Sequence, residues 1–121
     1  MNVVDSSALL AFLLGEEGAS TVEEVLERGA DCGAANWSEV AQKITSHHRN
    51  WGLARSLLLS YGLVVEPVTA GDAEWAAQRW RRGDGLSLAD RLCLALASRL
   101  DADVYTADAA WGVDGRVRQV R

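Results

Sequence analysis

The chain has few of the residues that cross-link or interrupt a fold. It contains two cysteines and a single proline, Pro67, among 121 residues. Neither cysteine belongs to a C-x-x-C pair, so we expect Cys32 and Cys93 to be buried thiols rather than a disulfide or a zinc site. No internal repeat or low-complexity segment is present. A chain of this length suits one compact domain, and we expect residues 1–121 to form it.

Long hydrophobic runs are also missing. The apolar stretch from Ala8 to Leu14 is too short to span a bilayer. It follows an acid, Asp5, rather than a basic segment, which argues against a signal peptide. We therefore expect a cytoplasmic protein that does not associate with a membrane.

Positive charge is scarce and unevenly placed. The formal net charge of −5 has the wrong sign for a protein that holds nucleic acid by bulk charge. Acids dominate residues 16–31, whereas arginines gather later in the chain. Lys43 is the only lysine, and the planar guanidinium of arginine suits phosphate. One face is therefore expected to be acidic and another locally basic.

The sequence alternates between short apolar segments and amphipathic helical patterns. Strands are predicted at residues 3–4, 32–35, 63–65, 104–106 and 117–120. Helices are predicted at residues 8–14, 20–28, 36–44, 53–60, 73–82 and 87–100. This alternation predicts an α/β fold in which helices cover both faces of a parallel sheet. Such sheets bind ligands at the carboxyl ends of their strands.

Four acids lie where the predicted strands end or the predicted helices begin. Asp5 ends the first strand, and Asp108 comes just past the fourth. Glu39 and Asp90 each lie in the first turn of a helix. Several of these positions share one edge if the sheet is parallel. Clustered carboxylates suit Mg²⁺ or Mn²⁺, which are hard cations that prefer oxygen ligands.

A simpler interpretation is that each acid only caps a helix. Helix dipoles and free N–H groups favour acids in any first turn. Ser87-x-x-Asp90 has capping-box spacing, Asn36-x-x-Glu39 is similar, and Asp5 precedes a helix. Two unit charges about 4 Å apart repel by about 4 kcal/mol at an effective dielectric near 20. Clustered carboxylates must therefore bind a cation or hold a proton, whereas capping alone predicts four separated acids.

Four short strings resemble the PIN domain, and more closely its VapC-type toxin branch of bacterial toxin–antitoxin pairs. They are VVDSSAL at 3–9, NWSEV at 36–40, LSLAD at 86–90 and YTAD at 105–108. Their order and spacing carry the resemblance, which runs essentially end to end. It implies a three-layer α/β/α sandwich with a parallel central sheet, in agreement with the alternation of elements.

The resemblance also implies the site. The four acids would hold Mg²⁺, with Mn²⁺ as a substitute, and would carry the catalysis. Ser6 and Thr106 match polar positions that help to orient metal-bound water. Ala107 stands where relatives often have a polar residue, so a side chain that would support the metal ligands is missing at this position. Asp114 stays open as a further acid.

The implied activity is metal-dependent hydrolysis of RNA phosphodiester bonds, by an endoribonuclease that acts as the toxin of a toxin–antitoxin pair. Bound ions would polarise the phosphate and lower the pKa of an attacking water. The implied partners are the RNA substrate, a cognate antitoxin protein and a second copy of the chain in a homodimer. Arg79, Arg82 and Arg91 are candidates for contact with the RNA backbone, although Arg79 and Arg82 equally fit a solvated helix face.

Histidine and tryptophan give weaker signals. His47 and His48 are adjacent, so on a helix they point about 100° apart and cannot chelate as an i, i+4 pair does. We expect both on the surface. The five tryptophans could stack on bases, but tryptophan is more often found in a core or an interface. We expect Trp51 at an interface, on a helix that the resemblance assigns to protein contact.

Other function classes fit less well. A phosphoacceptor receiver domain needs a lysine near its last strand, far from Lys43 in the sequence. A haloacid-dehalogenase phosphatase needs a second acid two residues after Asp5, where Ser7 stands. No glycine-rich phosphate loop is present. The remaining alternative is a catalytically inactive PIN scaffold that binds RNA or an antitoxin-like partner, and the presence of all four acids argues against it.

Overall fold

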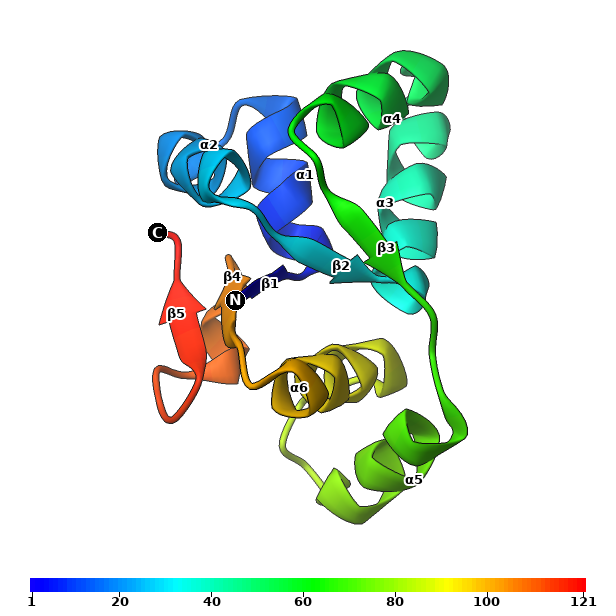
Figure 1. The fold of residues 1–121 in the computed structure, drawn as a ribbon, viewed down its shortest axis with the longest axis vertical. Helices are drawn as coiled ribbons and strands as arrows, with labels where there is room; N and C mark the ends of the chain where they lie inside the picture. Colours follow the sequence, from blue (N-terminus) through cyan, green and yellow to red (C-terminus); the bar gives the residue numbers. More distant parts are fainter.

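Strands and helices alternate along the chain in the structure, a computed structural model that describes residues 1–121 (Figure 1). The elements are, in order, β1 (Asn2–Val4), α1 (Ser6–Leu14), α2 (Ala19–Arg28), β2 (Asp31–Gly33), α3 (Ala34–Ser46), α4 (Trp51–Ser60), β3 (Val64–Glu66), α5 (Ala70–Arg79), α6 (Leu88–Leu100), β4 (Asp103–Thr106), the short 3-10 helix η1 (Ala109–Trp111) and β5 (Val117–Gln119).

The five strands form one parallel sheet in the order β3-β2-β1-β4-β5. β1 is central, and its Val3 pairs with Asp31 of β2 on one side and with Val104 of β4 on the other. Because the strands are parallel, the carboxyl ends of β1, β2 and β4 lie at the same edge. The predicted α/β fold with a parallel central sheet is confirmed.

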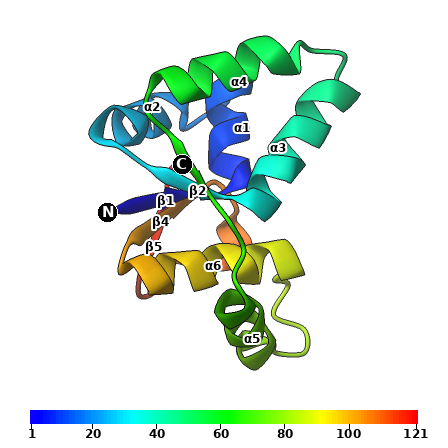
Figure 2. The same cartoon turned by 45° about the vertical axis from the view of Figure 1, so that its right-hand side comes forward.

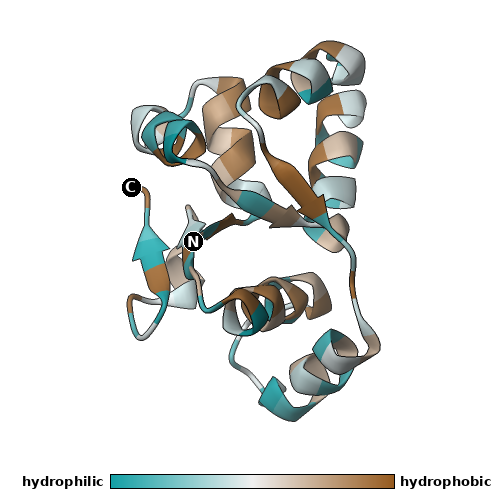
Figure 3. Cartoon of the chain, in the orientation of Figure 1, coloured by the Kyte–Doolittle hydropathy of each residue, from teal (hydrophilic) through white to brown (hydrophobic).

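Helices cover both faces of this sheet. Helices α1 to α4 lie on one face and α6 on the other, with α5 packed outside α6 (Figures 1 and 2). Successive residues of β1 serve the two faces, as the period of a strand requires. Val4 belongs to the core beneath α1 to α4, and Val3 belongs to the core beneath α6. Figure 3 shows apolar residues along β3 and hydrophilic residues at the end of α5.

Several helix boundaries differ from the prediction, and the starts of α5 and α3 show the cause. The fifth helix spans Ala70–Arg79 instead of residues 73–82, because Thr69 and Asp72 form a capping box that starts it earlier. The third helix begins at Ala34, directly after Gly33, so β2 ends before the predicted residue 35. The predicted start of α6 is confirmed, since Ser87 caps it and forms a capping box with Asp90.

The structure also tests the predictions made for the cysteines, the histidines and Trp51. Cys32 and Cys93 are buried free thiols, as expected. His47 and His48 are exposed. Trp51 is half-buried, and its ring packs edge-to-face against Trp37 at a centroid distance of 5.0 Å. None of the helices combines the length and the apolar character that a bilayer span requires.

Candidate active site

Asp5 is the most firmly held acid of the four. It follows β1, is the N-cap of α1, and is 2% exposed. Its Oδ1 accepts a hydrogen bond from the Ala8 N–H at 2.8 Å, and its Oδ2 accepts one from the Thr106 hydroxyl at 2.6 Å. The Ser7 hydroxyl lies 2.8 and 2.9 Å from the two oxygens. Donors on both oxygens therefore hold the carboxylate in one orientation.

Ser7 is a residue that the sequence reasoning missed. Its hydroxyl also lies 3.1 Å from Thr106 Oγ1 and accepts a hydrogen bond from the Ala107 N–H at 2.9 Å. The Asp108 N–H donates to Thr106 Oγ1 at 3.0 Å. Ser7 thus joins the end of β1 to the end of β4. Local sequence indicates only that Ser7 lies within reach of Asp5, two residues away.

Glu39 is oriented by two other side chains. The Ser6 hydroxyl donates to Glu39 Oε1 at 3.0 Å, and the Asn36 amide donates to the same oxygen at 2.9 Å. Both bonds end on Oε1, which leaves Oε2 without a protein donor. The structure therefore places Ser6 beside Glu39 rather than beside Asp5. Asn36, which is buried in α3, is a second residue that sequence reasoning did not assign to the site.

Asp90 and Asp108 each cap a helix with one oxygen. Asp90 Oδ2 accepts a hydrogen bond from the Ser87 N–H at 2.9 Å. Asp108 Oδ1 accepts one from the Ala110 N–H at 2.9 Å and is the N-cap of η1. The capping interpretation is thus confirmed for these acids and for Asp5, but it is wrong for Glu39, because α3 starts after Gly33 and has no side-chain cap. In both Asp90 and Asp108 the second carboxylate oxygen has no protein donor.

Although these acids cap different helices, their charges still affect one another's pKa values. Burial raises the pKa of Asp5 to about 6, against hydrogen bonds that lower it, and the charge of Asp90 adds to the rise. Burial also raises the pKa of Asp90, and the charges of Glu39 and Asp108 contribute to that shift. None of the four acids forms an ion pair with a basic side chain. The charge of Asp90 is therefore felt at Asp5, and the charges of Glu39 and Asp108 are felt at Asp90, with no basic side chain to offset them.

The four acids do not form a ready-made metal cage. No group of three or more His, Cys, Asp or Glu side chains is arranged to hold a metal ion. The donors that face the site are nevertheless carboxylate oxygens with no positive partner, and such a set suits a hard divalent cation. The role of these acids as metal ligands stays a prediction.

A shallow depression of about 430 Å³ opens beside Glu39. Residues of α1 and α3 line it, namely Ser6, Leu10, Glu39, Gln42, Lys43 and Ser46. Ser6 and Glu39 thus present their polar groups at the surface of the molecule. A polar ligand can reach Glu39 from this side.

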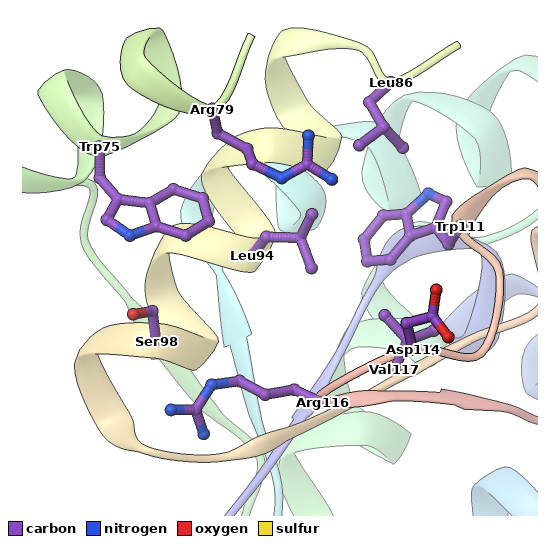
Figure 4. A pocket seen from close by; sticks show the side chains of 9 residues that line it. All are labelled: Trp75, Arg79, Leu86, Leu94, Ser98, Trp111, Asp114, Arg116 and Val117. Carbon is purple, nitrogen blue, oxygen red and sulfur yellow. The ribbon is translucent and has the colours of Figure 1, made fainter. Parts of the chain in front are cut away.

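The arginine candidates make contacts of their own. Arg91 Nη1 donates to the Ala76 carbonyl of α5 at 2.7 Å, so Arg91 joins two helices. Arg79 pairs with Asp84 at 3.3 Å, and the Arg82 guanidinium lies 5.8 Å from the centre of a Trp80 ring. Asp114 lies on the exposed loop before β5, where it lines a separate pocket (Figure 4).

Comparison with known proteins identifies relatives of this chain. Residues 3–112 match the PIN domain family. Ribonuclease VapC42 of Mycobacterium tuberculosis is 38% identical over 106 residues, which cover 78% of this chain and 81% of that protein. A toxin–antitoxin complex from Klebsiella pneumoniae superposes with a TM-score of 0.81 at 18% identity, over 100% of this chain and 98% of that chain. Mycobacterium tuberculosis VapC20, described as a sarcin–ricin loop cleaving toxin, superposes with a TM-score of 0.75 at 19% identity, over 95% of each chain. The chain therefore belongs to the PIN domain family, and within it to the VapC branch.

Proposed function

We propose that this chain is a Mg²⁺-dependent endoribonuclease that hydrolyses RNA phosphodiester bonds and acts as the toxin of a toxin–antitoxin pair. The observation that carries the proposal is that none of the four acids has a basic partner, and that Glu39, Asp90 and Asp108 each keep one carboxylate oxygen without a protein donor. Caps for three separate helices do not require carboxylates that repel one another. The ribonuclease relatives support RNA as the substrate.

The donor set specifies which residues would hold the ion. Asp5, Glu39, Asp90 and Asp108 would bind Mg²⁺, or Mn²⁺ in its place, through carboxylate oxygens. When bound, such an ion supplies Lewis-acid chemistry toward the phosphate and a nucleophilic water, and it reverses the sign of the local charge.

The chain's own residues orient the acids. Thr106 and Ser7 hold both oxygens of Asp5, and Ser6 and Asn36 fix Oε1 of Glu39. The free oxygen of Glu39 is therefore set in one direction before any ligand binds. Residues fixed by such hydrogen bonds lose little entropy when they engage a ligand.

An apolar surface supports the proposed protein partners. A groove of about 360 Å³ runs between α1, α3 and α4, and it includes Leu57 and Leu53, the latter 70% exposed. Contiguous exposed apolar residues are typical of protein contact sites. We place the second copy of the homodimer and the cognate antitoxin on this side. A cellular RNA substrate and a soluble antitoxin imply a cytoplasmic location.

RNA cleavage by the purified protein tests the proposal. Cleavage should require Mg²⁺ or Mn²⁺, stop in excess EDTA, and fall by about a hundredfold to a thousandfold in Asp5→Asn or Asp108→Asn, the scale of removing one group that stabilises charge in the transition state. Asp103→Asn is the matched control, because Asp103 lies at the start of β4, at the opposite edge of the sheet. The control should cleave as the wild type does. Equal cleavage by wild type and Asp5→Asn would instead favour the inactive binding scaffold.

A further inference from the structure

A second pocket lies between α5, α6 and the loop from η1 to β5 (Figure 4). Its volume is about 280 Å³. Trp75 comes from α5 and Trp111 from η1, and the two indoles lie on opposite sides of the pocket, with Leu94 of α6 between them. The volume lies just below the usual range for drug-sized ligands, so it suits one base with its sugar.

Arginines surround this pocket on a protein of net negative charge. Arg79 and Arg116 line it, and each shares an exposed ion pair, with Asp84 at 3.3 Å and with Asp101 at 2.9 Å. Exposed pairs of this kind are weak and exchange readily. Trp75 and Arg79 also line an adjoining depression of about 200 Å³.

That depression adds a third arginine, Arg81. The Arg81 guanidinium contacts only the backbone carbonyls of Gln78 and Trp80, at 2.8 Å each, so its charge is not neutralised. Hydrophilic residues at this end of α5 are visible in Figure 3. The pocket and the depression together combine aromatic rings with positive charge, the two features that bind single-stranded nucleic acid.

The segments that carry two of the acids also build this pocket. Trp111 ends the η1 turn that Asp108 caps. Leu86, which lines the pocket, directly precedes Ser87, the cap residue bonded to Asp90. An RNA strand with a phosphate at the acids therefore has a neighbouring nucleotide within reach of the pocket.

From this placement we infer that the pocket binds one nucleobase of the RNA beside the cleaved bond. The base packs on Trp75 and against Leu94 and the exposed edge of Trp111, which is 8% exposed, and Arg79 and Arg81 contact its phosphate. Asp114, which lines the pocket and has no ion-pair partner, accepts hydrogen bonds from the base edge. Guanine is favoured, because its Watson–Crick edge offers adjacent N–H donors to a carboxylate. The inference rests on the proposed function and deepens it, by naming where substrate selection occurs.

Binding of mononucleotides tests the pocket without any catalysis. The wild-type protein is titrated with guanosine 5′-monophosphate in EDTA while the five tryptophan indole N–H signals are followed by NMR. The signals of Trp75 and Trp111 should shift, whereas those of Trp37 and Trp51, which pack together at the junction of α3 and α4, should not. Unmoved Trp75 and Trp111 signals, or equal shifts of every indole, would overturn the inference.

Variants give the second part of the test. Trp75→Ala should weaken guanosine monophosphate binding by about tenfold, the scale of one base–aromatic stack. Trp80→Ala is the matched control, because Trp80 ends the same helix, is 50% exposed and lies outside the pocket. Asp114→Asn should abolish the preference for guanosine over uridine monophosphate. Equal affinity of the wild type for both nucleotides would refute the role of Asp114.

Cleavage assays separate this inference from the proposed nuclease. Trp75→Ala should raise KM for RNA by about tenfold and leave kcat nearly unchanged, since Trp75 binds substrate away from the acids. Nucleotide binding by a wild type that cleaves no RNA would refute the nuclease and leave the pocket supported. Cleavage by a wild type whose pocket indoles do not respond to nucleotide would refute the pocket alone.

Discussion

Thr106 Oγ1 lies 2.6 Å from Asp5 Oδ2, in a hydrogen bond that joins residues 101 positions apart in the chain. The bond follows from strand register, because Val4 of β1 pairs with Tyr105 of β4 and the Asp5 N–H donates to the Tyr105 carbonyl. The ends of both strands are thereby fixed side by side. Thr106 thus orients Asp5, and its role toward metal-bound water stays a prediction.

Removing this hydroxyl should affect both stability and activity. In Thr106→Val a buried carboxylate loses its shortest donor, which costs about 1.5–3 kcal/mol of unfolding free energy. Cleavage should fall at least about tenfold, because Asp5 is then held by fewer donors. Urea denaturation and RNA cleavage measure the two effects. Thr106→Ser keeps the hydroxyl and should stay close to wild type; a Thr106→Val protein of unchanged stability would contradict this account of Asp5.

The raised pKa of Asp5 predicts how the metal-free protein responds to pH. The pKa of Asp5 is about 6 in the folded chain, against an ordinary value of 3.8. Between these values the folded protein keeps a proton that the unfolded chain has lost, so stability falls as pH rises through this window. Asp5→Asn removes the loss and should be more stable than wild type by about 1–3 kcal/mol at pH 7.5.

Urea denaturation in EDTA at pH 3.5 and pH 7.5 measures this difference. At the lower pH the wild-type carboxyl is protonated in the folded state and mostly protonated in the unfolded chain, so the advantage of Asp5→Asn should nearly disappear. An Asp5→Asn protein that is clearly less stable than wild type at pH 7.5 would contradict the assignment of a strained, buried charge at Asp5.

Protons should also compete with the divalent ion. Burial raises the pKa values of both Asp5 and Asp90, so a protonated site loses ligand charge as pH falls. Mn²⁺ affinity, measured by calorimetry, should increase from pH 5 to about 7 and then level off. Cleavage should follow the same curve. Affinity that is already maximal at pH 5 would show that these carboxyls do not bind the ion.

Arg91 should stabilise the fold rather than bind RNA. Its guanidinium donates to the Ala76 carbonyl at 2.7 Å, across the contact between α5 and α6. Arg91→Met keeps much of the aliphatic bulk and should lower the unfolding free energy by about 1.5–3 kcal/mol. Arg55→Met, at an exposed position of α4, is the control and should have little effect. If Arg91→Met instead loses RNA binding at unchanged stability, Arg91 contacts the RNA backbone.

The sequence was sufficient for the fold because hydrophobic periodicity records which residues are buried. All five strands and six helices appear near their predicted positions. The start of α5 was misplaced because the cues there are a cap, Thr69 and Asp72, and not an apolar stripe. Capping and electrostatic interaction do not exclude each other at Asp5, which caps α1 and whose pKa is raised in small part by the charge of Asp90.

The supporting residues of the site were harder to predict. Ser7 and Thr106 are 99 residues apart, and their contact exists only once β1 and β4 are paired. The contact of Ser6 with Glu39 likewise spans 33 residues. Periodicity carries no information on such partners, because either serine could face either acid until α1 and α3 are packed. The acids could be found from residue type alone, whereas the hydroxyl groups that donate to them could be found only from the tertiary contacts.

The side chains of β1 have a consequence for how the protein unfolds. Val3 is fully buried in the core beneath α6, and Val4 is fully buried in the core beneath α1 to α4. One strand of three residues therefore belongs to both hydrophobic clusters. Neither half of the molecule can open while the other stays intact. Unfolding should accordingly be a single cooperative transition, and backbone amides of β1 should be among the last to exchange with solvent.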